Sequence, residues 1–132
     1  MQMIERFLQN DRFARRVGIE LLEVSPGRAK VRLAIGPEHL NGAGIVHGAA
    51  IFALADFAFA AASNSHDTIA VAINVSISFL KAVREGTLTA EATELAINPK
   101  LGSYTVRVTD ESGELVAIFQ GMVYRKKDPI TA

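Results

Sequence analysis

The chain has 132 residues, of which 49% are hydrophobic. That composition excludes a disordered chain, and the length suits one domain with a real core. Fourteen basic residues balance fourteen acidic ones, so net charge gives no reason to expect binding to nucleic acid or to an anionic membrane surface. Cysteine is absent, which excludes disulfides and zinc–thiolate sites and suits a reducing, cytoplasmic compartment.

The N-terminal third begins with an amphipathic stretch. Residues 1–17 predict two short helices, the second capped by Asp11 and ended by Gly18. Two strands are then expected at 18–24 and 28–35, followed by a loop rich in glycine. No signal peptide is expected, because the N-terminus is charged and lacks a long apolar core.

Residues 45–62 are apolar except for His47 and Asp56. The run nearly reaches the ~20 residues that span a membrane, but Asp56 lies near its middle and its many alanines make it only mildly hydrophobic. We therefore expect a buried core helix from Gly48 to Ser63, apolar nearly all round. A buried carboxylate is costly unless it is paired or used, so Asp56 is the first candidate for function.

Four more strands are predicted after the helix. In the first of them, the alternate residues from Val71 to Phe79 are expected on one face of the sheet. The last strand leads into a charged tail that is expected to fray over residues 126–132. The strands are expected at 69–83, 87–95, 103–110 and 114–127, with a short hairpin at 111–114. Consecutive strands favour an antiparallel sheet, so the predicted fold is α+β, with six antiparallel strands wrapped around one long helix.

The start of this helix can form a site. The first N–H groups of a helix have no internal partner and carry the positive end of the helix dipole, so they can polarise a carbonyl or hold an oxyanion. Gly48 suits this role, because its missing side chain lets a ligand approach the backbone. Asp56 could attack the carbonyl or deprotonate a water that does so. Asn41, in the preceding loop, could orient that water or the substrate.

The same residues resemble a known family. The segment HLNGAGIVHGAAIFALAD is similar to the His-x-Asn-x-x-Gly-x-x-His-Gly-Gly…Asp motif of hotdog-fold acyl-CoA thioesterases, nearest to the phenylacetic acid degradation type. The similarity extends over nearly the whole chain, from FARRVGIELLEVSPGRAKVRL to LVAIFQGMVYR. It implies one hotdog domain over residues 1–132 that hydrolyses an acyl-CoA, with an aryl or arylacetyl chain as one option. No cofactor or metal is implied, because coenzyme A is part of the substrate.

The resemblance also implies site residues. Asp56 takes the catalytic carboxylate position, and Gly48 the position whose N–H polarises the thioester carbonyl. Asn41 and His47 match the Asn of the motif and the His before its Gly. Contacts to the pantetheine would fall on Asn74 and Phe79, and contacts to the CoA phosphates on Lys81, Arg84 and Lys100. The chain departs from the family pattern at Ala49 and Ala82, which replace a Gly and a Pro, and at Ala60 and Ala72, where related members place a hydroxyl.

Plainer interpretations stay open. Asp56 can be a structural carboxylate, His47 a hydrogen-bonded group at the helix start, and the three basic residues solvated charges. His39 and His66 are expected on the surface or in loops, and the histidines and Asp56 lack the compact spacing of a metal site. Two other functions also stay open: a hotdog dehydratase that uses its His and carboxylate on hydroxyacyl thioesters, and a non-catalytic acyl-CoA-binding module.

One geometric argument concerns assembly. Along a helix that rises ~1.5 Å per residue, Gly48 and Asp56 stand roughly 12 Å apart, so one helix cannot bring both to one carbonyl. Two antiparallel copies of the helix about a two-fold axis can. The sequence therefore predicts a homodimer with shared active sites. The resemblance adds a homotetramer, as a dimer of dimers, and the partners expected are acyl-CoA and further copies of the chain, with no nucleic acid and no membrane.

Overall fold

The computed structural model describes residues 2–131; the first and last residues, where the expected N-terminal segment begins and the expected tail ends, lie outside the described residues. Three helices, one short 3-10 turn and six strands follow in chain order. Their bounds are α1 (Gln2–Gln9), α2 (Arg12–Val17), β1 (Glu20–Ser25), β2 (Arg28–Ala34), η1 (Pro37–His39), α3 (Gly48–Ser63), β3 (Thr68–Phe79), β4 (Thr87–Ile97), β5 (Leu101–Thr109) and β6 (Leu115–Pro129).

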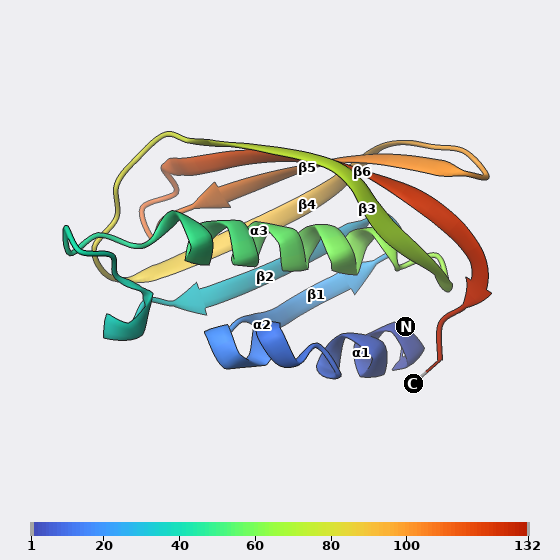
Figure 1. Cartoon of the computed structure of the whole chain (residues 1–132), viewed down its shortest axis with the longest axis horizontal. Coiled ribbons are helices and arrows are strands. Elements are labelled where there is room, and N and C mark those ends of the chain that lie inside the picture. The colour runs from blue at the N-terminus through green and yellow to red at the C-terminus, as the bar shows by residue number, and fades with distance from the viewer. Residues whose placement is uncertain (1, 132) are drawn as a thin grey trace.

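The six strands form one sheet in the order β1-β2-β4-β5-β6-β3, and every neighbouring pair is antiparallel. The sheet curves around α3, which lies across its concave face (Figure 1). The predicted α+β architecture, six antiparallel strands around one long helix, is confirmed. β1 and β3 are the two edge strands, and the strands before and after α3 in the chain, β2 and β3, lie toward opposite edges of the sheet.

The long helix has the predicted bounds, Gly48–Ser63. It is buried along most of its length because its side chains pack on the sheet, where Phe59 meets Tyr104 and Phe119 at ring-centroid distances of 5.8 and 5.4 Å. Gly121 of β6 makes this packing possible, since a Cβ there would lie 2.6 Å from the Phe59 ring. The core is therefore built of aromatic rings set between small residues.

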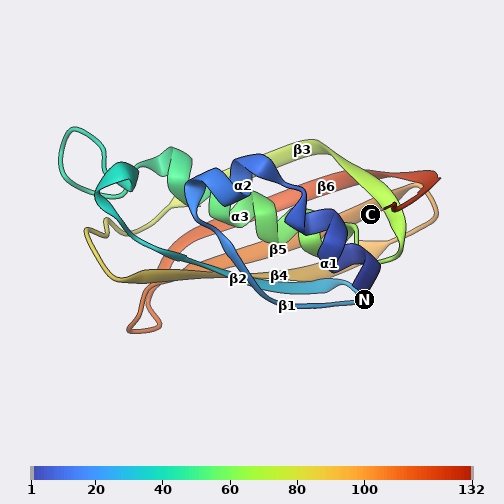
Figure 2. The same cartoon turned by 90° about the horizontal axis from the view of Figure 1, so that it is seen from below.

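The N-terminal helices also follow the prediction. Asp11 caps α2 by accepting a hydrogen bond from the Ala14 N–H at 2.9 Å, and Gly18 ends it in the left-handed region with a φ of 98°, where a residue without a Cβ is favoured. Both helices lie alongside α3, on the same side of the sheet (Figure 2). They cover one flank of the long helix and leave the flank beside β3 free.

The predicted face of β3 is wrong over its first half. The pairing of β3 with β6 shifts between Ala72 and Asn74, which is a β-bulge at Ile73, and a one-residue shift exchanges the two faces of a strand. Phe119 faces α3, and its partner Ile77 therefore does too, together with Val75 and Phe79. Val71 instead pairs with the exposed Tyr124. Alternation in the sequence cannot reveal a bulge, and this explains the error.

The frayed tail is the second correction. β6 continues to Pro129, and Thr68 pairs with that residue at the far end of the sheet. Ile130 is buried, and its N–H donates to the Asp67 carbonyl at 3.0 Å. The charges of residues 125–128 suggested a loose end, but one apolar residue after them anchors the strand. Within residues 2–131, no helix is both long and apolar enough to cross a membrane.

Candidate active site

A cavity of about 420 Å³ lies at the start of α3. It brings together four of the predicted site residues: Asn41, Gly48, Phe79 and Lys81. Asn41 comes from the loop before the helix, Gly48 from its first turn, and the other two from the end of β3 and the segment after it. We call this space the Gly48 cavity. No carboxylate is among its lining residues, so it holds hydrogen-bond donors and a cation but no base.

Gly48 is needed for close approach. A Cβ at this position would lie 3.2 Å from Cζ of Phe79, which is tighter than most side-chain contacts allow. Phe79 is about half exposed and closes over the first helical turn. The glycine therefore lets an aromatic ring and the open N–H groups of a helix start share one small space, where an oxygen with partial negative charge would be stabilised.

Asn41 shapes the loop that enters the site. Its Oδ1 accepts hydrogen bonds from the N–H groups of Ala43 and Ile45, at 2.9 and 3.3 Å, and its own N–H donates to the Ile45 carbonyl at 2.8 Å. Because Oδ1 is occupied by the loop, the group that Asn41 can offer a ligand is its Nδ2 amide, a donor. Asn41 can therefore act on a ligand as a hydrogen-bond donor, but not through Oδ1 as an acceptor.

His47 is the N-cap of α3. Its Nδ1 accepts a hydrogen bond from the Ala49 N–H at 3.0 Å, so the neutral ring carries its proton on Nε2. The side chain does not line the Gly48 cavity. It lines a second space of about 310 Å³ on the other side of the same turn. The structure therefore gives His47 a capping role and separates its ring from Asn41 and Gly48.

Asp56 lies on a stripe of α3 that the sheet covers only in part. Gly48, Phe52, Asp56 and Ala60, four residues apart, are all partly exposed, and together they define the α3 stripe. Burial raises the pKa of the Asp56 carboxyl above its ordinary value of 3.8, and the negative charge of Asp11 adds to that rise. Within one chain Asp56 is two helical turns from Gly48, roughly 12 Å along the axis, and it lines no part of the Gly48 cavity.

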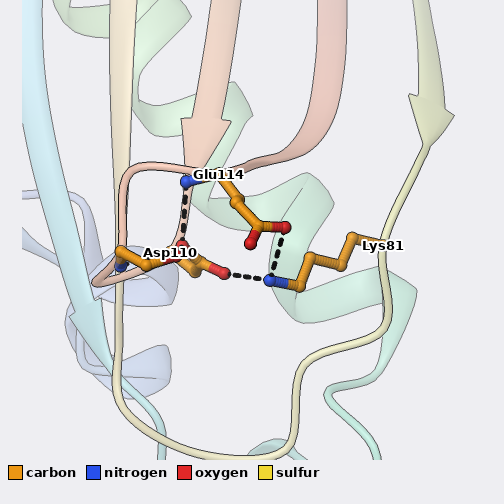
Figure 3. Close-up of polar contacts among 4 residues, drawn as sticks. Lys81, Asp110 and Glu114 are labelled. Atoms are coloured by element: carbon orange, nitrogen blue, oxygen red, sulfur yellow. Dashed lines mark hydrogen bonds and ion pairs between the residues drawn. The ribbon is translucent and has the colours of Figure 1, made fainter.

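Lys81 is held by two carboxylates. Its Nζ donates to Asp110 at 2.5 Å and to Glu114 at 2.9 Å, across the hairpin between β5 and β6 (Figure 3). These bonds raise the pKa of Lys81 and hold the pKa of Asp110 well below its usual range. Asp110 also organises the turn through the N–H groups of Ser112 and Glu114. Lys81 is thus an anchored cation rather than a free solvated one.

The other predicted substrate contacts do not gather in one place. Arg84 donates to the Gly44 carbonyl at 3.4 Å, beside the loop of Asn41. Lys100 follows the opposite end of β4 (Figure 1), a strand of 11 residues that spans roughly 35 Å. Asn74 pairs with Met122 on the face that points away from α3. Within one chain, then, Lys100 and Asn74 are remote from the Gly48 cavity.

The remaining histidines have structural partners. His39 is buried rather than on the surface, with its Nε2 2.6 Å from the Val17 carbonyl and its Nδ1 accepting from the Gly36 N–H at 2.9 Å. His66 pairs with Glu94 at 2.8 Å. Within residues 2–131, no group of three His, Asp or Glu side chains could hold a metal ion. Sequence spacing could not find these pairs, because their partners lie 22 and 28 positions away.

Comparison with known proteins identifies the family to which this fold and this site belong. A family model described as the Thioesterase superfamily matches residues 43–117, from the loop of Asn41 into β6. The acyl-coenzyme A thioesterase PaaI of Escherichia coli is 36% identical over 124 residues, covering 93% of this chain and 89% of its own. A protein of Archaeoglobus fulgidus is 43% identical over 129 residues, covering 94% of this chain and 84% of its own.

Solved structures agree. That of the E. coli PaaI protein from the phenylacetic acid degradation operon has a TM-score of 0.94 and 34% identity, covering 98% of this chain and 95% of that one. A variant of PaaI from Thermus thermophilus has a TM-score of 0.84 and 35% identity, covering 88% and 100%. The chain therefore belongs to the Thioesterase superfamily and is an enzyme with the hotdog fold. Within that superfamily it is of the PaaI type, as the motif around Asp56 predicted.

Proposed function

We propose that this chain hydrolyses acyl-CoA thioesters at a site shared by two copies, with Asp56 of one copy acting on a carbonyl held at Gly48 of the other. The observation that carries the proposal is the composition of the Gly48 cavity. It has a helix start, the Asn41 amide and a cation, and its only missing element is a carboxylate. The carboxylate of α3 is partly exposed and lies outside that cavity.

The spacing of the α3 stripe supports this arrangement. Gly48 and Asp56 stand four residues before and after Phe52 on one side of the helix. If two copies of α3 lie antiparallel about a two-fold axis at Phe52, Gly48 of each helix faces Asp56 of the other. Such an interface is isologous and closed, so it gives two equivalent sites per dimer.

The β3 edge offers the surface for such a pairing. β3 carries no charged residue from Thr68 to Phe79, and Ile73 and Val75 are 54% and 38% exposed in the single chain. A long, apolar, unprotected edge strand is a template for pairing with another chain. Val75 and Phe79 lie on the α3 side of that edge, and Phe79 packs against Gly48, so the edge adjoins the α3 stripe. A further pairing of dimers into a homotetramer belongs to the same proposal.

The chemistry then follows from the groups present. The N–H groups at Gly48 and the Asn41 amide would polarise the thioester oxygen. The Asp56 carboxylate would either attack the carbonyl carbon, forming a mixed anhydride that water then hydrolyses, or remove a proton from a water that attacks it. In both routes the C–S bond breaks, CoA leaves as the thiol after it takes up a proton, and the acyl group leaves as the free acid. Neither route uses a cofactor.

The substrate class rests on the relatives. One is named an acyl-coenzyme A thioesterase, and a solved relative comes from a phenylacetic acid degradation operon, so we propose an aryl or arylacetyl-CoA as substrate. Lys81 and Arg84, beside the Gly48 cavity, would be the cations nearest to the CoA phosphates. Because Asp110 and Glu114 already bind the Lys81 ammonium, it is less available to a phosphate, and Arg84 is the better candidate of the two.

The test is release of free thiol from a panel of acetyl-, butyryl-, benzoyl-, phenylacetyl- and palmitoyl-CoA. The wild type should release CoA, and Asp56→Asn, which keeps the shape of the side chain, should reduce kcat by on the order of a hundredfold or more. A folded Asp56→Asn protein with unchanged thiol release would refute the assignment. Interconversion of hydroxyacyl and enoyl thioesters without thiol release would indicate the dehydratase, and binding without turnover the acyl-CoA-binding module.

A further inference from the structure

One buried histidine has no part in the site described so far. His39 ends η1 and is only 7% exposed. Its Nε2 lies 2.6 Å from the Val17 carbonyl at the end of α2, and its Nδ1 accepts a hydrogen bond from the Gly36 N–H at 2.9 Å. Because one nitrogen accepts and the other faces a carbonyl, the neutral ring carries its proton on Nε2. The side chain thus joins backbone groups of two different segments.

We propose that His39 is a positioning residue for the thioesterase reaction, which sets the place of the Asn41 amide and of the Gly48 N–H. This rests on the proposed function, because it takes these two groups to bind the thioester oxygen. The His39 side chain does not line the Gly48 cavity. It therefore acts on the reaction through the loop that it holds.

That loop, residues 39–47, leads directly into α3 and projects beyond the start of the helix (Figure 1). Its base is a short antiparallel ladder. The His47 N–H donates to the His39 carbonyl at 2.7 Å, and the Asn41 N–H donates to the Ile45 carbonyl at 2.8 Å. A β-bridge lies between these two bonds. A shift of His39 is therefore passed on both to the asparagine and to the first turn of the helix.

The loop is tied to its surroundings on two sides. On one side, the Val46 N–H donates to the Val83 carbonyl at 2.8 Å. Arg84 also donates to the Gly44 carbonyl at 3.4 Å, so this side is held to the segment after β3. On the other side, the His39 ring holds the loop to α2. Without the ring, the loop could pivot about the bonds that remain.

The two bonds of the ring differ in reach. Gly36 is three residues before His39, so its bond shapes only the local turn. Val17 is 22 positions away, in a helix that contacts α3. The Nε2 bond is therefore the one that fixes the loop relative to the long helix. A misplacement of reacting groups by about 1 Å can cost on the order of a hundredfold in rate, so a single buried bond can decide turnover.

The test uses two amides that each keep one of the two bonds. The side chain of Gln can place its Nε2 where the imidazole Nε2 lies, so His39→Gln keeps the donor to Val17. His39→Asn is shorter and keeps only the acceptor for Gly36. We expect His39→Asn to lower kcat by on the order of tenfold or more, and His39→Gln to restore most of it. KM should change less in both variants, because groups that bind the oxyanion act mainly on the transition state.

Ser65 offers a matched control at the other end of α3. It is 3% exposed, and its Oγ accepts from the Gly27 N–H at 2.8 Å and donates to the Ala62 carbonyl at 2.6 Å. Ser65→Ala therefore also removes a buried side chain that joins two backbone groups. Both Ser65→Ala and His39→Asn should lower Tm, but only His39→Asn should lower kcat. If a melting scan shows that His39→Asn is unfolded, His39→Leu, which fills the buried space without either bond, replaces it.

Amide hydrogen exchange reports on the loop independently of activity. In His39→Asn the amides of Asn41 and His47 should exchange faster than in the wild type, while those of β5 keep their rates. A folded His39→Asn protein with wild-type kcat overturns this inference while the proposed function stands. An equal loss of kcat in His39→Gln and His39→Asn overturns it as well, because the Nε2 bond would then not be the anchor. If the wild type releases no thiol from any ester, the proposed function itself fails.

Discussion

The two edges of the sheet are built differently. β1, at one edge, contains the acidic residues Glu20 and Glu23 and has a bulge at Leu22, and the N-terminal helices lie beside it (Figure 2). β3, at the other edge, has 12 residues without a charge and leaves several apolar side chains exposed. Charges and bulges are common devices against unwanted strand pairing. β1 has both a bulge and charges, whereas β3 has a bulge at Ile73 but no charged side chain.

The difference bears on where the active site is completed. The edge with apolar side chains is also the edge next to the α3 stripe, which carries Asp56. The edge at β1 lies beside α1 and α2 (Figure 2). An exposed apolar edge beside a partly buried carboxylate is unfavourable in an isolated chain, and both would be stabilised by a partner on this face. The predictions below test this asymmetry, from the largest expected effect to the smallest.

A charge placed on the β3 edge should have the largest effect. Val75→Lys introduces a cation at a position that is 38% exposed, and Leu22→Lys does the same on the β1 edge at 39% exposure. We expect Val75→Lys to give a folded monomer with thiol release reduced on the order of a hundredfold or more, since each site loses its partner's carboxylate. Leu22→Lys should remain assembled and active.

Sedimentation equilibrium measures the assembly, and circular dichroism establishes that both variants fold. A fully active Val75→Lys monomer would contradict the shared site, because Gly48 and Asp56 of one helix cannot reach one carbonyl. An assembled and active Val75→Lys protein would place the interface elsewhere.

Hybrid dimers give the next largest effect. Co-expression of Asp56→Asn and Asn41→Ala chains with two different tags allows hybrids to be purified. In a shared-site dimer, one site of each hybrid combines both lesions and the other is intact, so hybrids should have about half of the wild-type activity while each parent is inactive. If both residues act within one chain, every site of the hybrid carries a lesion and no activity returns.

These predictions depend on features that differ in how far the sequence revealed them. The bounds of α3 and the caps of α2 were predictable because a continuous apolar run and capping residues act locally. The bulge at Ile73 was not, since it depends on how β3 and β6 align. The same holds for Lys81, whose partners lie 29 and 33 positions away. The candidate residues could be named from the motif, but which of them share a cavity depends on long-range pairing.

The cations at the end of β3 should have a moderate effect. Arg84→Met should raise KM for CoA esters several-fold with kcat less affected, because contacts remote from the reacting atoms act equally in ground and transition states. Lys30→Met, which removes an exposed cation paired with Glu91 on the other side of the sheet, is the matched control and should leave KM unchanged.

Asp110→Asn sharpens this test. The amide oxygen still accepts the N–H groups of the turn, but the variant frees Lys81 from one of its two carboxylates. If Lys81 meets the phosphates, KM should fall, and it should rise again at high salt. A rise in KM with Asp110→Asn would mean that the anchored geometry of Lys81, not its charge, serves the substrate.

The smallest effect concerns stability and pH. Burial raises the pKa of Asp56 in the single chain, so the folded chain holds this proton more tightly than the unfolded chain does. The ionised carboxylate therefore costs stability at pH 7, and the cost disappears as the pH falls below the ordinary value of 3.8.

In the Val75→Lys background, adding Asp56→Asn should raise Tm at pH 7 by no more than a few degrees, because about 1 kcal/mol moves Tm by roughly 4 °C at this size. The gain should vanish near pH 3.5. In the assembled protein the gain should be smaller, because the helix start of the partner would stabilise the charge. Equal gains in both backgrounds, measured by melting scans across pH, would show that no partner helix faces Asp56.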